Sequence, residues 1–137
     1  MDQVEALAKS VSRSDRECVV TLREGVTLHG IKRPDTDPDL SWADSPEHVE
    51  FREAYNRDDA WCVGVEVWIC VHGHRVDHDS VWGICDGFGP WDGSSVVAEY
   101  VTEFGNSMVR GLPELLRARL AALEVEAGGV RALVEVN

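Results

Sequence analysis

The chain lacks any long apolar stretch. Across its 137 residues, unbroken apolar runs are only a few residues long, whereas a helix that spans a bilayer needs about 20 apolar residues. Acidic residues, Asp2 and Glu5, stand where a secretory signal peptide would carry positive charge. We therefore expect a cytoplasmic protein with no membrane contact.

Sequence motifs for common chemistries are also missing. The chain has no CxxC pair, which excludes a zinc ribbon and a thioredoxin-type redox pair. The glycine-rich residues 83–93 match neither GxxxxGKS/T nor GxGxxG, and no serine lies in a GxSxG elbow. We therefore predict a protein that is not an enzyme and that needs no cofactor.

Basic residues are scarce: lysine occurs only at Lys9 and Lys32, and the net charge is −12. Residues 33–60 carry nine acids and three arginines, and residues 76–109 carry six acids with no lysine or arginine. Each of these two acidic blocks therefore contributes −6, which is the whole imbalance. A chain without a basic patch is unsuited to direct contact with DNA or RNA.

The first part of the chain has the patterns of both helix and strand. Apolar residues at helical spacing predict a short helix over residues 2–11, with Asp2 as its cap. Alternating residues around Glu24-Gly25 predict a hairpin of strands 18–23 and 26–31. Residues 33–46 hold three prolines and four aspartates, which indicates an acidic loop over residues 33–45.

A helix and a second, longer hairpin are predicted next. Residues 46–56 follow a serine that can cap a helix. Strict alternation over residues 61–72 predicts a strand that folds back at Gly73-His74 onto residues 75–85.

The predicted turn fixes a pairing register for the second hairpin. It puts Val65 opposite Trp82, Val71 opposite Val76 and Cys62 opposite Cys85. The Cys62–Cys85 pair lies on the other face, together with Trp68 opposite Asp79 and Cys70 opposite Asp77. The sequence lacks an export signal, so we expect reduced thiols, and a pairing of Cys62 with Cys85 stays open.

The last third of the chain is predicted to be mostly helical. Spacings of four, three and four from Val97 to Met108 predict a helix that begins at Ser94 or Ser95 and stops at Gly111. A second helix follows from Pro113 to Gly128-Gly129, and residues 130–136 alternate like an edge strand. Together these elements predict a single α+β domain, 1–137, with an antiparallel sheet of two hairpins packed against two to three helices on one side.

The run HGHRVDH suggests a metal site at first sight. It resembles the HxHxDH signature of metallo-β-lactamase-like hydrolases, but it has one extra residue before Asp77. The predicted register puts His72 and His78 on opposite faces of the hairpin and His74 in its turn. We therefore predict no metal site.

Five tryptophans are many for this length, and indoles serve both in cores and as interaction anchors. Trp61 and Trp82 are expected on the core face. Trp42 and Trp91 lie in the acidic stretches, where each is either an exposed anchor or folded back over the core. The candidate partner-binding residues are Asp35, Asp37, Asp39, Trp42, Asp44, Glu47, Glu50, Asp77, Asp79, Asp86, Trp91, Asp92, Glu99 and Glu103.

The stretch from Asp59 to Ile84, above all DSVWGI at Asp79–Ile84, resembles small acidic, functionally uncharacterised proteins of actinobacterial phages. It departs from them at Val81 and Cys85, where those proteins carry leucine and an acid. The resemblance implies a phage accessory protein that acts in the host cytoplasm and disarms a host defence complex.

Charge and resemblance together suggest a function. The chain is expected to inhibit a basic, nucleic-acid-binding host protein of the CRISPR or restriction type, with carboxylates in place of DNA phosphates. This hypothesis needs the two acidic blocks to meet in one surface. The alternative is a structural or assembly module that oligomerises, for example as a homodimer, through a sheet edge or a helical pair.

Overall fold

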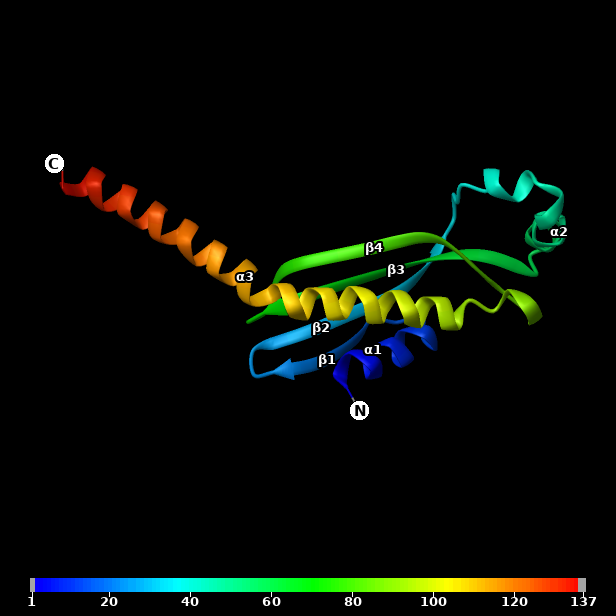
Figure 1. The fold of residues 1–137 in the computed structure, drawn as a ribbon, viewed down its shortest axis with the longest axis horizontal. Helices are drawn as coiled ribbons and strands as arrows, with labels where there is room; N and C mark the ends of the chain where they lie inside the picture. The colour runs from blue at the N-terminus through cyan, green and yellow to red at the C-terminus, as the bar shows by residue number, and fades with distance from the viewer. Residues whose placement is uncertain (1, 136–137) are drawn as a thin grey trace.

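The computed structural model describes residues 2–135, with side chains for residues 2–129. Four strands form one antiparallel sheet in the order β1-β2-β3-β4 (Figure 1). Their bounds are Cys18–Arg23 for β1, Val26–Asp35 for β2, Ala60–Val71 for β3 and His74–Gly87 for β4. The predicted α+β class and both hairpins are confirmed.

Two helices, α1 (Gln3–Ser12) and α3 (Ser94–Glu135), cover one face of this sheet (Figure 1). The Asp2 carboxylate caps α1 by accepting a hydrogen bond from the Val4 N–H at 2.9 Å. Leu7 of α1, Val101 of α3 and Ile69 of β3 are fully buried. The main core therefore lies between these helices and alternate positions of the strands.

A second, smaller cluster covers the other face at one end of the sheet. It is built from helix α2 (Val49–Asn56) and the short 3₁₀ turns η1 (Ser41–Asp44) and η2 (Pro46–His48). Phe51 of α2 packs with Ala60 and Cys62, which alternate along β3 with the helix-facing positions. This lobe gives the acidic segment between β2 and β3 a fixed position.

The acidic loop is shorter than predicted. Residues 33–35 continue β2, and Asp35 pairs with Cys62 of β3. The sequence suggested a loop from residue 33 onward because Pro34 lacks a backbone donor. The pairing with β3 holds the segment extended nonetheless.

The predicted turn of the long hairpin was wrong by one residue. Its two turn residues are His72 and Gly73, with φ of 48° and 81°, as a type I′ turn requires. Val63 still pairs with Ile84, but bulges shift the rest, so that Val65 pairs with Val81 instead of Trp82. A bulge adds one residue to one strand and moves its later side chains to the other face.

The predicted break at Gly111 and the tail strand were also wrong. α3 runs without interruption through Pro113 to Glu135, and position 136 lies outside the described residues. Pro113 removes one helical hydrogen bond. Met108 and Leu112 are buried before this point and Leu116 is partly buried after it, so packing on the sheet holds both sides in line.

Candidate functional site

An open groove lies where the acidic segment passes the end of β4. It has a volume of about 520 Å³ and is lined by Asp35, Asp37, Pro38, Asp39, Trp42, Trp82 and Gly83. The lining residues come from three places in the sequence: the end of β2, the turn η1, and β4. We call this hollow the acidic groove.

Glycine at position 64 makes room for one wall of the acidic groove. Gly64 follows the helix-facing Val63 along β3, so it faces away from the main core. A Cβ atom at this position would overlap the Trp82 ring. The indole therefore lies flat over the glycine, on the open face of the sheet.

Local hydrogen bonds hold the carboxylates of the groove. Asp35 Oδ1 accepts from the Asp37 N–H at 3.3 Å, and Asp39 Oδ1 accepts from the Ser41 N–H at 3.0 Å. The backbone hydrogen bond from Ser41 is the main cause that lowers the pKa of Asp39 below its usual value. Asp39 therefore stays ionised at neutral pH.

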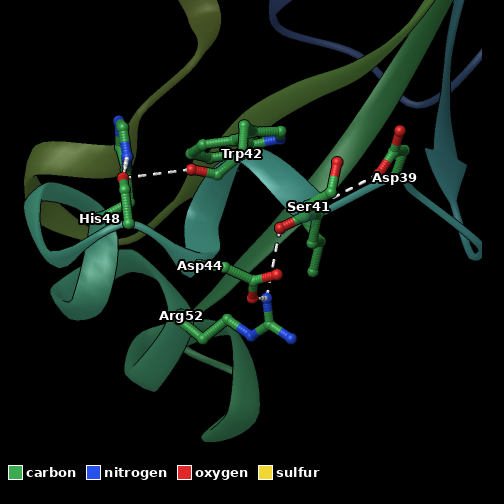
Figure 2. A network of polar contacts seen from close by, with 8 residues as sticks. Asp39, Ser41, Trp42, Asp44, His48 and Arg52 are labelled. Carbon is green, nitrogen blue, oxygen red and sulfur yellow. Dashed lines mark hydrogen bonds and ion pairs between the residues drawn. The ribbon is translucent and has the colours of Figure 1, made fainter.

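Figure 2 shows how the rest of the segment is fixed. The Arg52 guanidinium donates to Asp44 Oδ1 at 2.6 Å and to the Leu40 carbonyl at 3.2 Å. Trp42 lies against His48 and Phe51, with ring centroids 5.0 and 5.3 Å apart, and 39% of its surface stays exposed. The Arg52 guanidinium therefore neutralises Asp44. Trp42 is held by its two aromatic neighbours, and part of its indole stays exposed to solvent.

The groove carboxylates have no cationic partner of their own. Arg33, the nearest base in the sequence, pairs with Glu66 at 3.3 Å. Across residues 2–129, no ion pair reaches Asp35, Asp37 or Asp39. The acidic groove therefore carries three uncompensated negative charges beside two indole rings.

The structure does not bring the second acidic block to this groove. Asp77 and Asp79 pair with Ile69 and Val67, on the helix-covered side of the sheet. Ile69 lies seven residues along β3 from Cys62 at the groove end, about 23 Å at the rise of a strand. Their predicted pairing with Cys70 and Trp68 was wrong, because the turn lies one residue earlier than predicted and the bulge between Val63 and Val65 sets the register of this stretch.

Other predicted site residues lie elsewhere or have structural roles. Glu99 and Glu103 are exposed on α3, across the sheet from the groove, and Glu47 and Glu50 are exposed on the lobe. Of the predicted site residues, Asp35, Asp37, Asp39 and Trp42 therefore lie together at the acidic groove. The others lie at separate places on the molecule.

Two aspartates of the second block hold the start of α3. Asp86 Oδ1 accepts from the Gly87 N–H at 3.0 Å and from the Gly93 N–H at 2.9 Å. Asp92 accepts from the Ser94 hydroxyl at 2.6 Å and from its N–H at 2.9 Å. The hydroxyl hydrogen bond is the first cause that lowers the pKa of Asp92. Both carboxylates therefore cap backbone groups at this junction.

Sequence reasoning placed the tryptophans poorly. Trp61 and Trp82 were predicted in the core, but they are 37% and 46% exposed. The bulges turn the Trp82 side chain away from the helices. Trp61 packs against Phe88 instead of the main core. Trp91 is half-buried against the smaller cluster. Trp68, by contrast, is 6% exposed between His29 and Arg75. The only sequence signal for Trp82 was Gly64 on the neighbouring strand.

The histidines do not converge in the hairpin. His72 lies in the turn, while His74 pairs with Val71 and His78 pairs with Trp68. Among residues 2–129, no three His, Cys, Asp or Glu side chains are placed to hold a metal ion. The absence of a bound metal stays a prediction.

Cys62 and Cys85 are directly paired across β3 and β4, and both are free thiols. Burial, then the neighbouring Cys85 and Asp35, raises the pKa of Cys62 to about 11. Cys62 should therefore stay protonated at pH 8, and a thiol-specific disulfide reagent should label it only after unfolding. Peptide mapping after timed labelling checks this, and rapid labelling of Cys62 in the native protein would contradict it.

Fold and site together define a small α+β protein with an acidic, tryptophan-walled groove on the open face of its sheet. Comparison with family models, with curated proteins and with solved structures finds no match for this chain. Within the described part of the chain, no helix combines the length and the apolarity needed to cross a membrane.

Proposed function

We propose that the protein binds a basic segment of another protein in the acidic groove. The observation that carries this proposal is the set of three uncompensated carboxylates, Asp35, Asp37 and Asp39, beside the exposed indoles of Trp42 and Trp82. A groove with a volume of about 520 Å³ has room for a long side chain such as arginine or lysine.

The carboxylates and the indole rings of the acidic groove both favour the binding of a cation. Carboxylates accept charge-assisted hydrogen bonds from a guanidinium, and these are stronger than hydrogen bonds between neutral groups. An indole face attracts the same cation through its ring electrons. The net charge of −12 would also speed the encounter with a basic partner at low ionic strength.

A narrower form of the proposal concerns the identity of the partner. The overall charge and the resemblance to phage proteins favour an inhibitor of a nucleic-acid-binding host defence protein. The scattered positions of Asp77, Asp79, Glu99 and Glu103 do not suit a mimic of a long duplex. We therefore propose that the protein occupies one basic loop or pocket that the nucleic acid would otherwise contact.

A fluorescein-labelled arginine-glycine repeat peptide tests the groove. The triple variant D35N/D37N/D39N should bind this peptide at least about 10-fold more weakly, because it loses three acceptors of charge-assisted bonds. Binding is measured by fluorescence anisotropy in low and in moderate salt. Wild-type affinity should fall as salt rises.

The matched control is D77N/D79N/E103Q, which removes the same charge from exposed positions outside the groove. In moderate salt it should bind the peptide within about 2-fold of wild type, because distant surface charges are then largely screened. Equal losses in both triple variants would show that net charge, not the groove, attracts the peptide. Affinity that ignores salt would equally contradict the proposal.

The narrower proposal has its own experiment. Affinity capture from the host identifies basic partners, and each one is then tested for release of duplex DNA when the protein is added. Wild type should compete with the DNA, and D35N/D37N/D39N should not. A captured partner that keeps its DNA would contradict the inhibitor role while leaving the groove proposal intact.

A further inference from the structure

The end of α3 extends away from the rest of the molecule (Figure 1). Leu116 is the last α3 residue that packs against the main core. We call residues 117–135 of α3 the arm. Leu120 and Leu123 on the arm are 58% and 60% exposed, and exposed apolar residues are informative where they adjoin one another.

The exposed leucines continue a stripe that begins at the partly buried Leu116. Leu116, Leu120, Leu123 and Ala127 follow one another at spacings of four, three and four, the spacing of a and d positions in a coiled coil. Val125 is 75% exposed, but at 100° per residue it lies on the opposite side of the helix. Leu116, Leu120, Leu123 and Ala127 therefore form one continuous apolar face along the arm.

The arm also needs a packing partner to stay helical. It contains Gly128 and Gly129, and glycine is the poorest helix former after proline. Most helix stability in proteins comes from burial of an apolar face. Among residues 2–129, neither core cluster includes an arm residue.

We infer that the arm pairs in antiparallel orientation with the arm of a second copy of this chain. A two-fold axis then puts Leu120 of each copy opposite Leu123 of the other. The same register puts Leu116 of each copy opposite Ala127 of the other. This inference does not depend on the acidic groove.

The charges that flank the stripe fit this register. On one flank, Arg117 of each copy faces Glu124 of the other. On the other flank, Arg119, which also donates to the Val76 carbonyl of its own chain at 2.9 Å, faces Glu126. Within its own helix, neither Glu124 nor Glu126 has a lysine or arginine three or four residues away. The antiparallel pair therefore gives each of these acids a basic neighbour.

A hollow at the base of the arm favours the antiparallel over the parallel orientation. Its volume is about 240 Å³, and its lining is mostly apolar: Leu22, Arg23, Val26, Val109, Leu112 and Pro113. Val109 and Leu112 lie on the same side of α3 as the leucine stripe. In the antiparallel register, this hollow lies opposite positions 130–134 of the second copy, whereas in a parallel pair it would lie opposite the same hollow of the partner.

Sedimentation of the full chain between about 1 and about 100 µM tests the inference. Wild type should form a concentration-dependent dimer. The variant L120E/L123E should weaken dimerisation at least about 100-fold, because four buried leucines become charged. V125E adds a charge off the stripe and should leave the dimer unchanged. A monomer at every concentration, or equal dissociation by V125E, would overturn the inference.

Charge-reversal variants and a pair of single-cysteine variants test the register. E124R/E126R should weaken the dimer at least about 10-fold, and R117E/R119E/E124R/E126R should restore it. A mixture of L120C and L123C should form the cross-link 120–123 on mild oxidation, identified by peptide mapping, while neither variant alone cross-links at its new cysteine. Cross-linking of L120C with itself would show parallel pairing and would overturn the antiparallel assignment.

Discussion

Leu28→Ala is expected to lower the free energy of unfolding by about 3 to 5 kcal/mol, the range for a large aliphatic side chain lost from a tight core. Leu28 has no exposed surface, and it pairs with Val20 of β1 and Ile69 of β3. Its methyl group reaches the backbone of α3 at Gly105, where there is no room for a Cβ. The surrounding strands and helices cannot all move to fill the cavity.

Urea unfolding followed by circular dichroism measures this loss. Val19→Ala, on a neighbouring strand, is the matched control, because Val19 is 55% exposed and surface substitutions usually change stability by less than about 0.5 kcal/mol. Similar losses in the two variants would show that Leu28 is not in the core.

Gly64→Val is expected to weaken binding of the arginine-glycine peptide about 10-fold, because the new side chain overlaps the Trp82 ring. Trp82 is 46% exposed and can swing away from the sheet without breaking the fold. The free energy of unfolding should therefore fall by only about 1 to 3 kcal/mol. Peptide titration and urea unfolding of the same sample separate the two effects.

Gly111→Ala is the control for a glycine replacement. Position 111 has no neighbour within 4 Å of a new Cβ, and alanine favours the helix by about 1 kcal/mol. This variant should bind the peptide like wild type and unfold at slightly higher urea. Unchanged peptide binding in Gly64→Val would show that Trp82 is not part of the site.

The main elements of the fold could be predicted from local pattern. The alternation from Trp61 to Val71 specifies β3, and the Asp2 cap with its apolar spacing specifies α1. The register of β4 was not predicted, because the bulge at Ile69-Cys70 has no local signal, and Gly83, which forms the other bulge with a φ of 78°, was not interpreted as a bulge residue. α3 stays whole across Gly111 and Pro113 because contacts with the sheet outweigh local helix preference.

The candidate site was only partly predictable for a related reason. Asp35, Asp37 and Asp39 lie close in sequence, so their clustering needed no knowledge of the fold. Trp82 joins them only through the pairing of β4 with β3, which depends on a bulge. Whether the two acidic blocks meet is likewise a question of strand order, which net charge alone cannot answer.

The long outer edge of β4 has a consequence for behaviour at high concentration. This edge has 14 residues, and although Arg119 donates to its Val76 carbonyl, an outer edge of this length could template the addition of a strand from another molecule, the first step toward amyloid. β4 is interrupted by two bulges, and it carries Asp77 and Asp79 in the stretch beside the turn. Bulges distort the ladder and like charges repel an incoming copy. The aspartates that lie far from the groove are thus well placed to protect the sheet from aggregation.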